Sequence, residues 1–118
     1  MKKQDYIYDA KILSVVDGDT VDVEIDLGFC VLVRERMRLS GIDTAELTSP
    51  IPEMRKLAQD AKAFMVKYVG VNIVLKSFKK DKYGRFLAEI FIENDTESLN
   101  NYLIHAGLAK AYSGGVRS

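Results

Sequence analysis

The sequence lacks several features that would point to particular classes of protein. Its single cysteine, Cys30, excludes an internal disulfide and a zinc site built from several cysteines. No apolar run is long enough to cross a bilayer. The first ten residues contain two lysines that no apolar stretch follows, unlike a secretory signal. We therefore expect a cytoplasmic protein with no membrane partner, or a secreted one if a signal has been removed.

An excess of one charge is also absent, because 17 basic residues balance 17 acidic ones. This balance predicts weaker general affinity for nucleic acid than a basic relative would have. The charges are nevertheless segregated along the chain. Residues 17–26 hold five acids and no base, whereas residues 34–38 (RERMR) and 76–85 (KSFKKDKYGR) are rich in lysine and arginine. Segregation of this kind allows a cation and a phosphate to be held side by side.

The length of 118 residues fits a single domain, 1–118, with one core, and a hydrophobic content of 47% suffices for a globular interior. Alternating apolar residues, turn signals and one helical stripe predict five strands and two helices. Strands are expected over 6–16, 21–27, 29–39, 71–75 and 85–92, and helices over about 53–69 and 98–106. The order of three strands, a helix, two strands and a helix is that of a five-stranded OB-fold barrel. The predicted fold class is therefore α+β, mostly β.

The longer predicted helix carries a continuous apolar stripe, which we expect to face the core. Its members are Leu57, Ala61, Phe64, Met65 and Tyr68. Cys30 lies in an apolar run and is expected to be a small core residue. Both prolines fall within 43–52, which predicts a loop before the helix.

Three short stretches carry residues suited to phosphate chemistry: DGDT (17–20), RLSGIDTAE (38–46) and DKYGR (81–85). Asp19 and Asp43 offer hard anionic oxygens, which suit calcium or magnesium rather than zinc or copper. Arg38 and Arg85 offer planar, two-pronged donors for a phosphate. Asp17 is better explained as part of the turn, and the remaining acids of 21–27 as a solvated strand face.

Glu46 lies beside these residues in the sequence and could orient or deprotonate a water. A simpler interpretation exists for the whole set, because acids with arginines nearby usually form a surface ion-pair cluster of little energetic value. An arginine such as Arg85 after a Tyr-Gly turn is, taken alone, more often a solvated turn residue. Tyr112 is either a stacking platform for a base or part of the core.

Taken together and in order, the stretches VVDGDTV, RLSGIDTAE, DKYGRFLAEIFI and GLAKAY resemble the staphylococcal nuclease family. The resemblance runs from about Asp9 to Tyr112 and implies an OB-fold barrel with helices packed on it. Family members usually continue with another helix after the last tyrosine. Only six residues follow Tyr112, so we expect two packed helices without the third, C-terminal one.

The resemblance also implies roles for individual residues. It implies a calcium ion bound by the carboxylates of Asp19 and Asp43 and by the backbone carbonyl of Thr44. Glu46 corresponds to the glutamate that acts on the attacking water, and Arg38 and Arg85 to the two arginines on the scissile phosphate. Three further residues correspond to nucleotide contacts: Lys82 and Tyr83 at the terminal phosphate, and Tyr112 under the base.

The implied function is a calcium-dependent, monomeric nuclease that cleaves DNA or RNA, preferably single-stranded. Water would attack the phosphorus in line and leave 3′-phosphates. A second function stays open, namely a catalytically weak or inactive OB-fold module that binds nucleic acid or protein. Two departures from the family pattern bear on this choice. Ala45 stands where the family has a proline, which loosens the backbone between Asp43 and Glu46, and the hairpin EIDLGFCVLVRER is unusually long.

Overall fold

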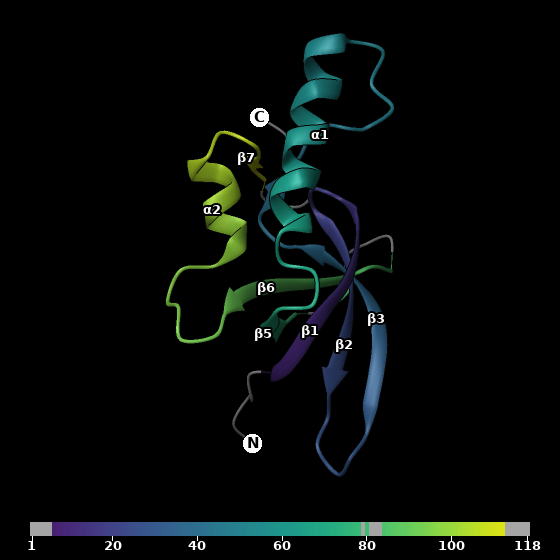
Figure 1. Ribbon diagram of the computed structural model, residues 1–118, viewed down its shortest axis with the longest axis vertical. Helices are drawn as coiled ribbons and strands as arrows, with labels where there is room; N and C mark the ends of the chain where they lie inside the picture. Colours follow the sequence, from purple (N-terminus) through teal and green to yellow (C-terminus); the bar gives the residue numbers. More distant parts are fainter. Residues whose placement is uncertain (1–5, 79, 81–83, 113–118) are drawn as a thin grey trace.

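The computed structural model describes residues 6–78, 80 and 84–112 of the chain (Figure 1). The two helices and the five longer strands follow each other in the order that the sequence pattern indicates. The elements are β1 (Tyr6–Asp17), β2 (Thr20–Asp26), β3 (Leu32–Leu39), β4 (Ile42–Asp43), α1 (Pro52–Val66), β5 (Asn72–Ser77), β6 (Phe86–Ile92), α2 (Leu99–His105) and β7 (Lys110–Ala111). Neither helix of this described part is long and apolar enough to span a membrane.

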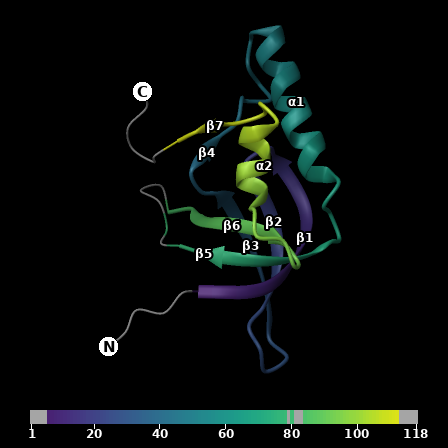
Figure 2. The same cartoon turned by 90° about the vertical axis from the view of Figure 1, so that its left-hand side faces the viewer.

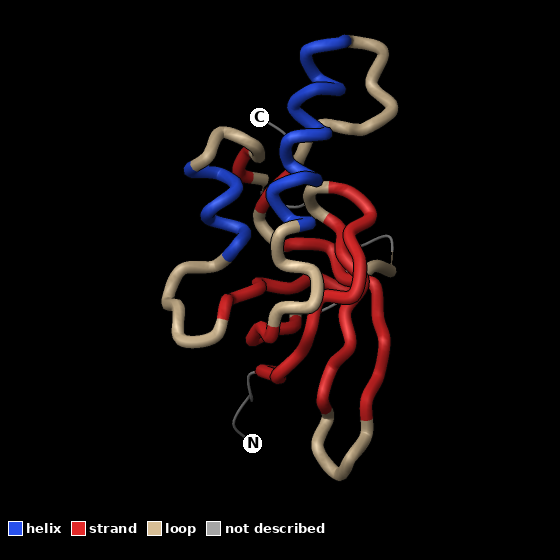
Figure 3. The backbone as a smooth tube through the Cα atoms, in the orientation of Figure 1, coloured by secondary structure: helices blue, strands red, loops and turns tan. Residues whose placement is uncertain are grey.

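Five strands close into a barrel in the order β1-β2-β3-β6-β5 (Figures 1 and 3). The pairing of β3 with β6 is parallel, and all other pairings in the barrel are antiparallel. Both helices lie against the same end of the barrel, whereas the β2–β3 hairpin extends from the other end (Figure 2). These features confirm the predicted α+β class and the OB-fold barrel.

The strict alternation of β2 separates its two faces. Val21, Val23 and Ile25 point into the barrel and are buried in its core. On the outer face the acids lie opposite the arginines of β3, so that Asp22 pairs with Arg36 at 2.8 Å and Glu24 with Arg34 at 3.5 Å. The acids of β2 and the basic segment 34–38 seen in the sequence are therefore paired across one hairpin. Such half-exposed pairs contribute little stability.

The tip of this hairpin corrects two predictions. Strand β3 begins at Leu32 rather than at residue 29, because Phe29 and Cys30 have positive φ and form the turn. Cys30 is exposed and is not a core residue. The physical reason is that the hairpin projects beyond the barrel, where no second layer covers its apolar residues (Figure 1). Phe29, next to it, is 100% exposed.

Helix α1 ends at Val66, three residues before the predicted end at 69. The N–H of Gly70 donates to the carbonyl of Ile12 in β1 at 2.8 Å, which turns the chain toward β5. Of the predicted stripe, Ala61 and Met65 are fully buried, while Phe64 and Tyr68 pack against the core from its edge. Leu57 is only half-buried, and its neighbour Ala58 is buried instead.

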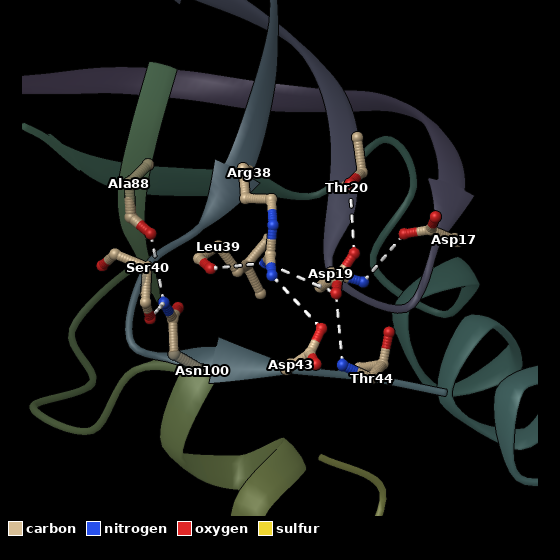
Figure 4. Close-up of polar contacts among 10 residues, drawn as sticks. All are labelled: Asp17, Asp19, Thr20, Arg38, Leu39, Ser40, Asp43, Thr44, Ala88 and Asn100. Carbon is tan, nitrogen blue, oxygen red and sulfur yellow. Dashed lines mark hydrogen bonds and ion pairs between the residues drawn. The ribbon is translucent and has the colours of Figure 1, made fainter. Parts of the chain in front are cut away.

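Helix α2 is attached to the barrel through the buried side chain of Asn100. Its Nδ2 donates to the carbonyls of Ser40 at 2.8 Å and Ala88 at 3.1 Å, and its Oδ1 accepts from the N–H of Ile90 at 3.2 Å (Figure 4). One side chain thus links α2, β6 and the turn between β3 and β4. After α2 the chain returns to form β7, which pairs with β4 through Ile42↔Ala111 and Asp43↔Lys110.

Replacing Asn100 by Ala should destabilise the protein by about 2–3 kcal/mol, because buried backbone groups would lose their partners. The free energy of unfolding from urea denaturation measures this loss. Asn101→Ala is the matched control, since its exposed side chain has the same chemistry one residue later. Equal stability of the two variants would contradict the structural role assigned to Asn100.

Candidate functional site

Four of the residues singled out in the sequence meet at one end of the barrel (Figure 4). Asp19 lies in the turn between β1 and β2, Arg38 near the end of β3, Asp43 at the end of β4, and Thr44 directly after it. Register explains the convergence, because Thr20 of β2 pairs with Arg38 of β3. The N–H of Leu39 also donates to the carbonyl of Asp19 at 2.8 Å.

The guanidinium of Arg38 lies between the two carboxylates. Its Nη1 is 3.3 Å from Oδ2 of Asp19, and its Nη2 is 3.3 Å from Oδ1 of Asp43 (Figure 4). Nη1 also donates to the carbonyl of Leu39 at 3.1 Å. Arg38 and Asp19 are each only 7% exposed. This is therefore a buried network and not the solvated surface cluster that is the commoner arrangement of such residues.

Asp19 is held by backbone and side-chain donors as well as by Arg38. Its Oδ2 accepts from the N–H of Thr44 at 3.1 Å, and its Oδ1 from the hydroxyl of Thr20 at 3.1 Å. Asp17 closes the turn as predicted, since its Oδ1 accepts from the N–H of Asp19 at 3.2 Å. The carboxylate of Asp19 is consequently fixed in orientation before any ligand binds.

The two acids of the turn respond oppositely to this environment. Burial alone raises the pKa of the Asp19 carboxyl, but the hydrogen bond with Asp17, the charge of Arg38 and the Thr44 N–H outweigh it and lower that pKa below its usual value. Burial, together with the hydrogen bond to Asp19 and repulsion by its charge, raises the pKa of Asp17 from 3.8 to about 6. Asp19 is therefore the acid of the pair that ionises first, and Asp17 follows only as pH rises through about 6.

The donor set suits a hard cation. Asp19 and Asp43 already share one positive charge, that of Arg38, and the carbonyl of Thr44 belongs to the same segment. In the described part of the chain no third carboxylate, histidine or cysteine joins them. Calcium accepts about six to eight oxygen ligands in flexible geometry and takes water for those that the protein does not supply. Two carboxylates and a carbonyl fit such an ion.

Glu46 and Tyr112 line one cleft with Asp43 and Thr44 of this network. The cleft has a volume of about 830 Å³. Glu46 is exposed on the loop after β4, whereas Tyr112 is half-buried. The N–H of Tyr112 donates to the carbonyl of Gly41 at 2.8 Å, which places it beside the β3–β4 turn. The pairing of β7 with β4 is what brings Tyr112 near Glu46.

Arg85 is exposed and directly precedes β6. Leu87, two residues later, is in register with Arg38 in the parallel β3–β6 pair. Arg85 therefore belongs to the same end of the sheet as the buried network. Lys82 and Tyr83, the two predicted contacts to a terminal phosphate, lie outside the described residues.

Sequence reasoning missed two residues that hold the site together. Asn100 ties the segment between Arg38 and Asp43 to α2, as described above, and an Asn in the first turn of a helix carries no sequence signal for that role. Gly18 is the other. A Cβ placed on it would lie 2.6 Å from Cβ of Ala61 and 3.0 Å from Cγ2 of Thr44. The DGD pattern indicates a turn but not this close approach.

Comparisons with known proteins agree with the geometry. The family model described as "Staphylococcal nuclease homologue" matches residues 36–117, more than half of the chain. The chain belongs to the staphylococcal nuclease family. The thermonuclease of Staphylococcus hyicus is 30% identical over 86% of this chain, and that of Staphylococcus intermedius is 34% identical over 82%. An uncharacterized protein of Methanocaldococcus jannaschii is 34% identical over 89%.

The chain spans only 59% of the length of the Methanocaldococcus protein and 57% and 55% of the two thermonucleases. The part of the chain that the family model matches contains Arg38, Asp43, Glu46 and Arg85, whereas Asp19 precedes it.

Asp17→Asn tests the electrostatics of the turn. Because the folded state raises the pKa of Asp17, this carboxyl contributes stability below pH about 4 and loses it as pH rises through about 6. Asparagine keeps the acceptor for the Asp19 N–H but carries no charge. Above pH 6 we expect the free energy of unfolding of the variant to exceed that of the wild type by about 1 kcal/mol, a value reduced for solvent screening of this half-buried group. Near pH 4 we expect no difference between the two.

Urea unfolding at both pH values measures the difference. Asp26→Asn is the control, because Asp26 also accepts a turn N–H, from Gly28, but is exposed. A gain for Asp17→Asn that is equal at the two pH values would refute the electrostatic explanation.

Proposed function

We propose that this protein is a calcium-dependent nuclease that hydrolyses phosphodiester bonds of DNA and RNA. Water attacks the phosphorus in line, and 3′-phosphates are left. The observation that carries the proposal is the buried Asp19–Arg38–Asp43 network in a chain of the staphylococcal nuclease family. Thermonuclease is also the name of two of its relatives.

Asp19, Asp43 and the carbonyl of Thr44 would hold the calcium ion. When bound, the ion supplies positive charge that stabilises the negative charge developing on the phosphate oxygens. With its two carboxylate partners holding the ion, Arg38 would donate to the substrate phosphate. The carbonyl of Leu39, at 3.1 Å, keeps Arg38 oriented while it does so.

The chain's own residues divide the remaining work of phosphodiester hydrolysis. Arg38 and Arg85 donate to the phosphate as charge builds on it, an electrostatic contribution that is largest where the donors are already oriented. Glu46 accepts the proton of the attacking water from its exposed position at the cleft, where water is available. Tyr112, in the same cleft, contacts a base of a single-stranded substrate, and Lys82 and Tyr83 contact its terminal phosphate.

A catalytically weak or inactive module that binds nucleic acid or protein is the second candidate. Ala45 favours it, because the family's proline would restrict the backbone between Asp43 and Glu46. Retention of all five charged residues of the site favours the enzyme. The protein is proposed to act as a monomer in either case.

Incubation with single-stranded DNA should give cleavage in millimolar calcium and none in excess EGTA, with products ending in 3′-phosphate.

Asp43→Asn should abolish calcium binding in calorimetry and reduce cleavage, since the site has few charged ligands to lose. Asp60→Asn, an exposed acid on α1 that pairs with Lys56, is the control. Cleavage undiminished by EGTA would refute the metal assignment, and absence of cleavage would favour the binding module.

The arginines separate enzyme from binding module. Arg38→Lys and Arg85→Lys keep the charge but remove the two-pronged geometry. For a nuclease we expect each to lower kcat by about 100-fold with nucleotide affinity nearly unchanged, because the lost interaction strengthens in the transition state. Arg36→Lys is the control, as its guanidinium pairs with Asp22 on the same hairpin. Near-normal kcat in both variants would exclude these arginines as the phosphate clamp.

A further inference from the structure

The turn that carries Asp19 approaches helix α1 closely at Gly18. A Cβ on Gly18 would lie 2.6 Å from Cβ of Ala61, far inside the distance of about 3.5–4.0 Å at which carbon atoms normally pack. Gly18 does not share the positive φ of Gly41 or Gly70. Glycine is therefore required at this position by space and not by backbone conformation.

The side chain of Thr44 borders the same space. The Cβ built on Gly18 would lie 3.0 Å from Cγ2 and 3.2 Å from Oγ1 of Thr44. Gly18 is thus close to both α1 and the segment that follows β4. Thr44 also donates its N–H to Oδ2 of Asp19 at 3.1 Å, so the residue whose side chain limits the space at Gly18 also binds the carboxylate of the turn through its backbone.

Helix α1 is anchored independently of the turn. Met65, one turn after Ala61, is fully buried in the barrel core, and Gly70 bonds to Ile12 of β1 just beyond the helix. Ala61 is itself completely buried. The helix consequently presents a fixed surface to Gly18, and the size of the side chain at position 61 sets how closely the turn approaches it.

We propose that Ala61 is a positioning residue: its contact with Gly18 sets where Asp19 stands relative to Thr44 and Arg38. The inference rests on the proposed function, because it concerns the same cation site. A methyl group on Gly18 would have to move the turn or the helix by about 1 Å, the gap between 2.6 Å and normal packing, and methyl groups added at 61 extend from the other side of the same contact. Hydrogen bonds and charge-assisted contacts of 3.1–3.3 Å do not survive such a shift unchanged.

Ala61→Val tests this, with Ala10→Val as its control. Ala10 is a core residue of β1, the strand that leads into the turn, and it lies about 20 Å from Asp17 at the normal rise per residue. The substitution adds the same two methyl groups at both positions. Both variants should lose similar stability in urea through overpacking. Only Ala61→Val should bind calcium about 10-fold more weakly and lose about 10- to 100-fold in kcat, with little change in KM.

Moving a methyl group across the contact gives a second test. Gly18→Ala should weaken calcium binding, and Gly18→Ala/Ala61→Gly should recover part of the affinity because the clash is relieved. Stability should not recover in parallel, since glycine inside α1 costs about 1 kcal/mol. If calcium affinity and stability changed together through these variants, the contact would be structural only and the proposal would be overturned.

Amide hydrogen exchange of the Thr44 N–H separates this inference from the proposed function. It reports the bond to Asp19 without any metal, and it should be faster in Ala61→Val than in Ala10→Val. If the wild type binds no calcium, the proposed function fails and this exchange rate alone decides the inference. Unchanged exchange at Thr44, or unchanged calcium affinity in a wild type that binds calcium, overturns it.

Discussion

The guanidinium of Arg38 is charged and buried, and the site depends on how that charge is compensated. Removing a guanidinium from solvent is costly unless anions and acceptors surround it. Here Asp19, Asp43 and the carbonyl of Leu39 supply that compensation. Loss of one partner of such a buried pair typically costs about 3–5 kcal/mol. The network therefore requires that β2, β3 and β4 keep their relative positions.

The barrel provides this constraint by register rather than by contacts among the charged groups. The pairing of Thr20 with Arg38, and of Arg38 with Leu87, fixes three strands side by side at the end where the acids lie. Asn100 then holds the turn between β3 and β4 from the side of α2, and Gly18 lets α1 approach from another direction. The two segments that carry Asp19 and Asp43 are thus each adjoined by a close contact, at Gly18 and at Ser40 respectively.

This arrangement also relates the site to catalysis. Hydrolysis of a phosphodiester needs positive charge already in place where negative charge will develop. A guanidinium that is already buried and held by the carbonyl of Leu39 meets part of that need before substrate binds. The same two carboxylates that neutralise it supply the oxygens for a hard cation, which is why one cluster serves both roles in the proposed nuclease. In contrast, Asp22 and Glu24 of β2 each pair with one arginine of β3, so carboxylates do not outnumber guanidiniums in these pairs.

The sequence by itself determined the five barrel strands and two helices in outline, the α+β class and the identity of the charged residues, because alternation and helical periodicity are local properties of the chain. It also indicated that Asp17 belongs to the turn. Only the tertiary structure decided which of those residues are buried together, since that depends on register between strands distant in sequence. The exposure of Cys30, the pairing of β4 with β7, the role of Asn100 and the packing of Gly18 against Ala61 all follow from contacts between such segments, and no local pattern encodes them.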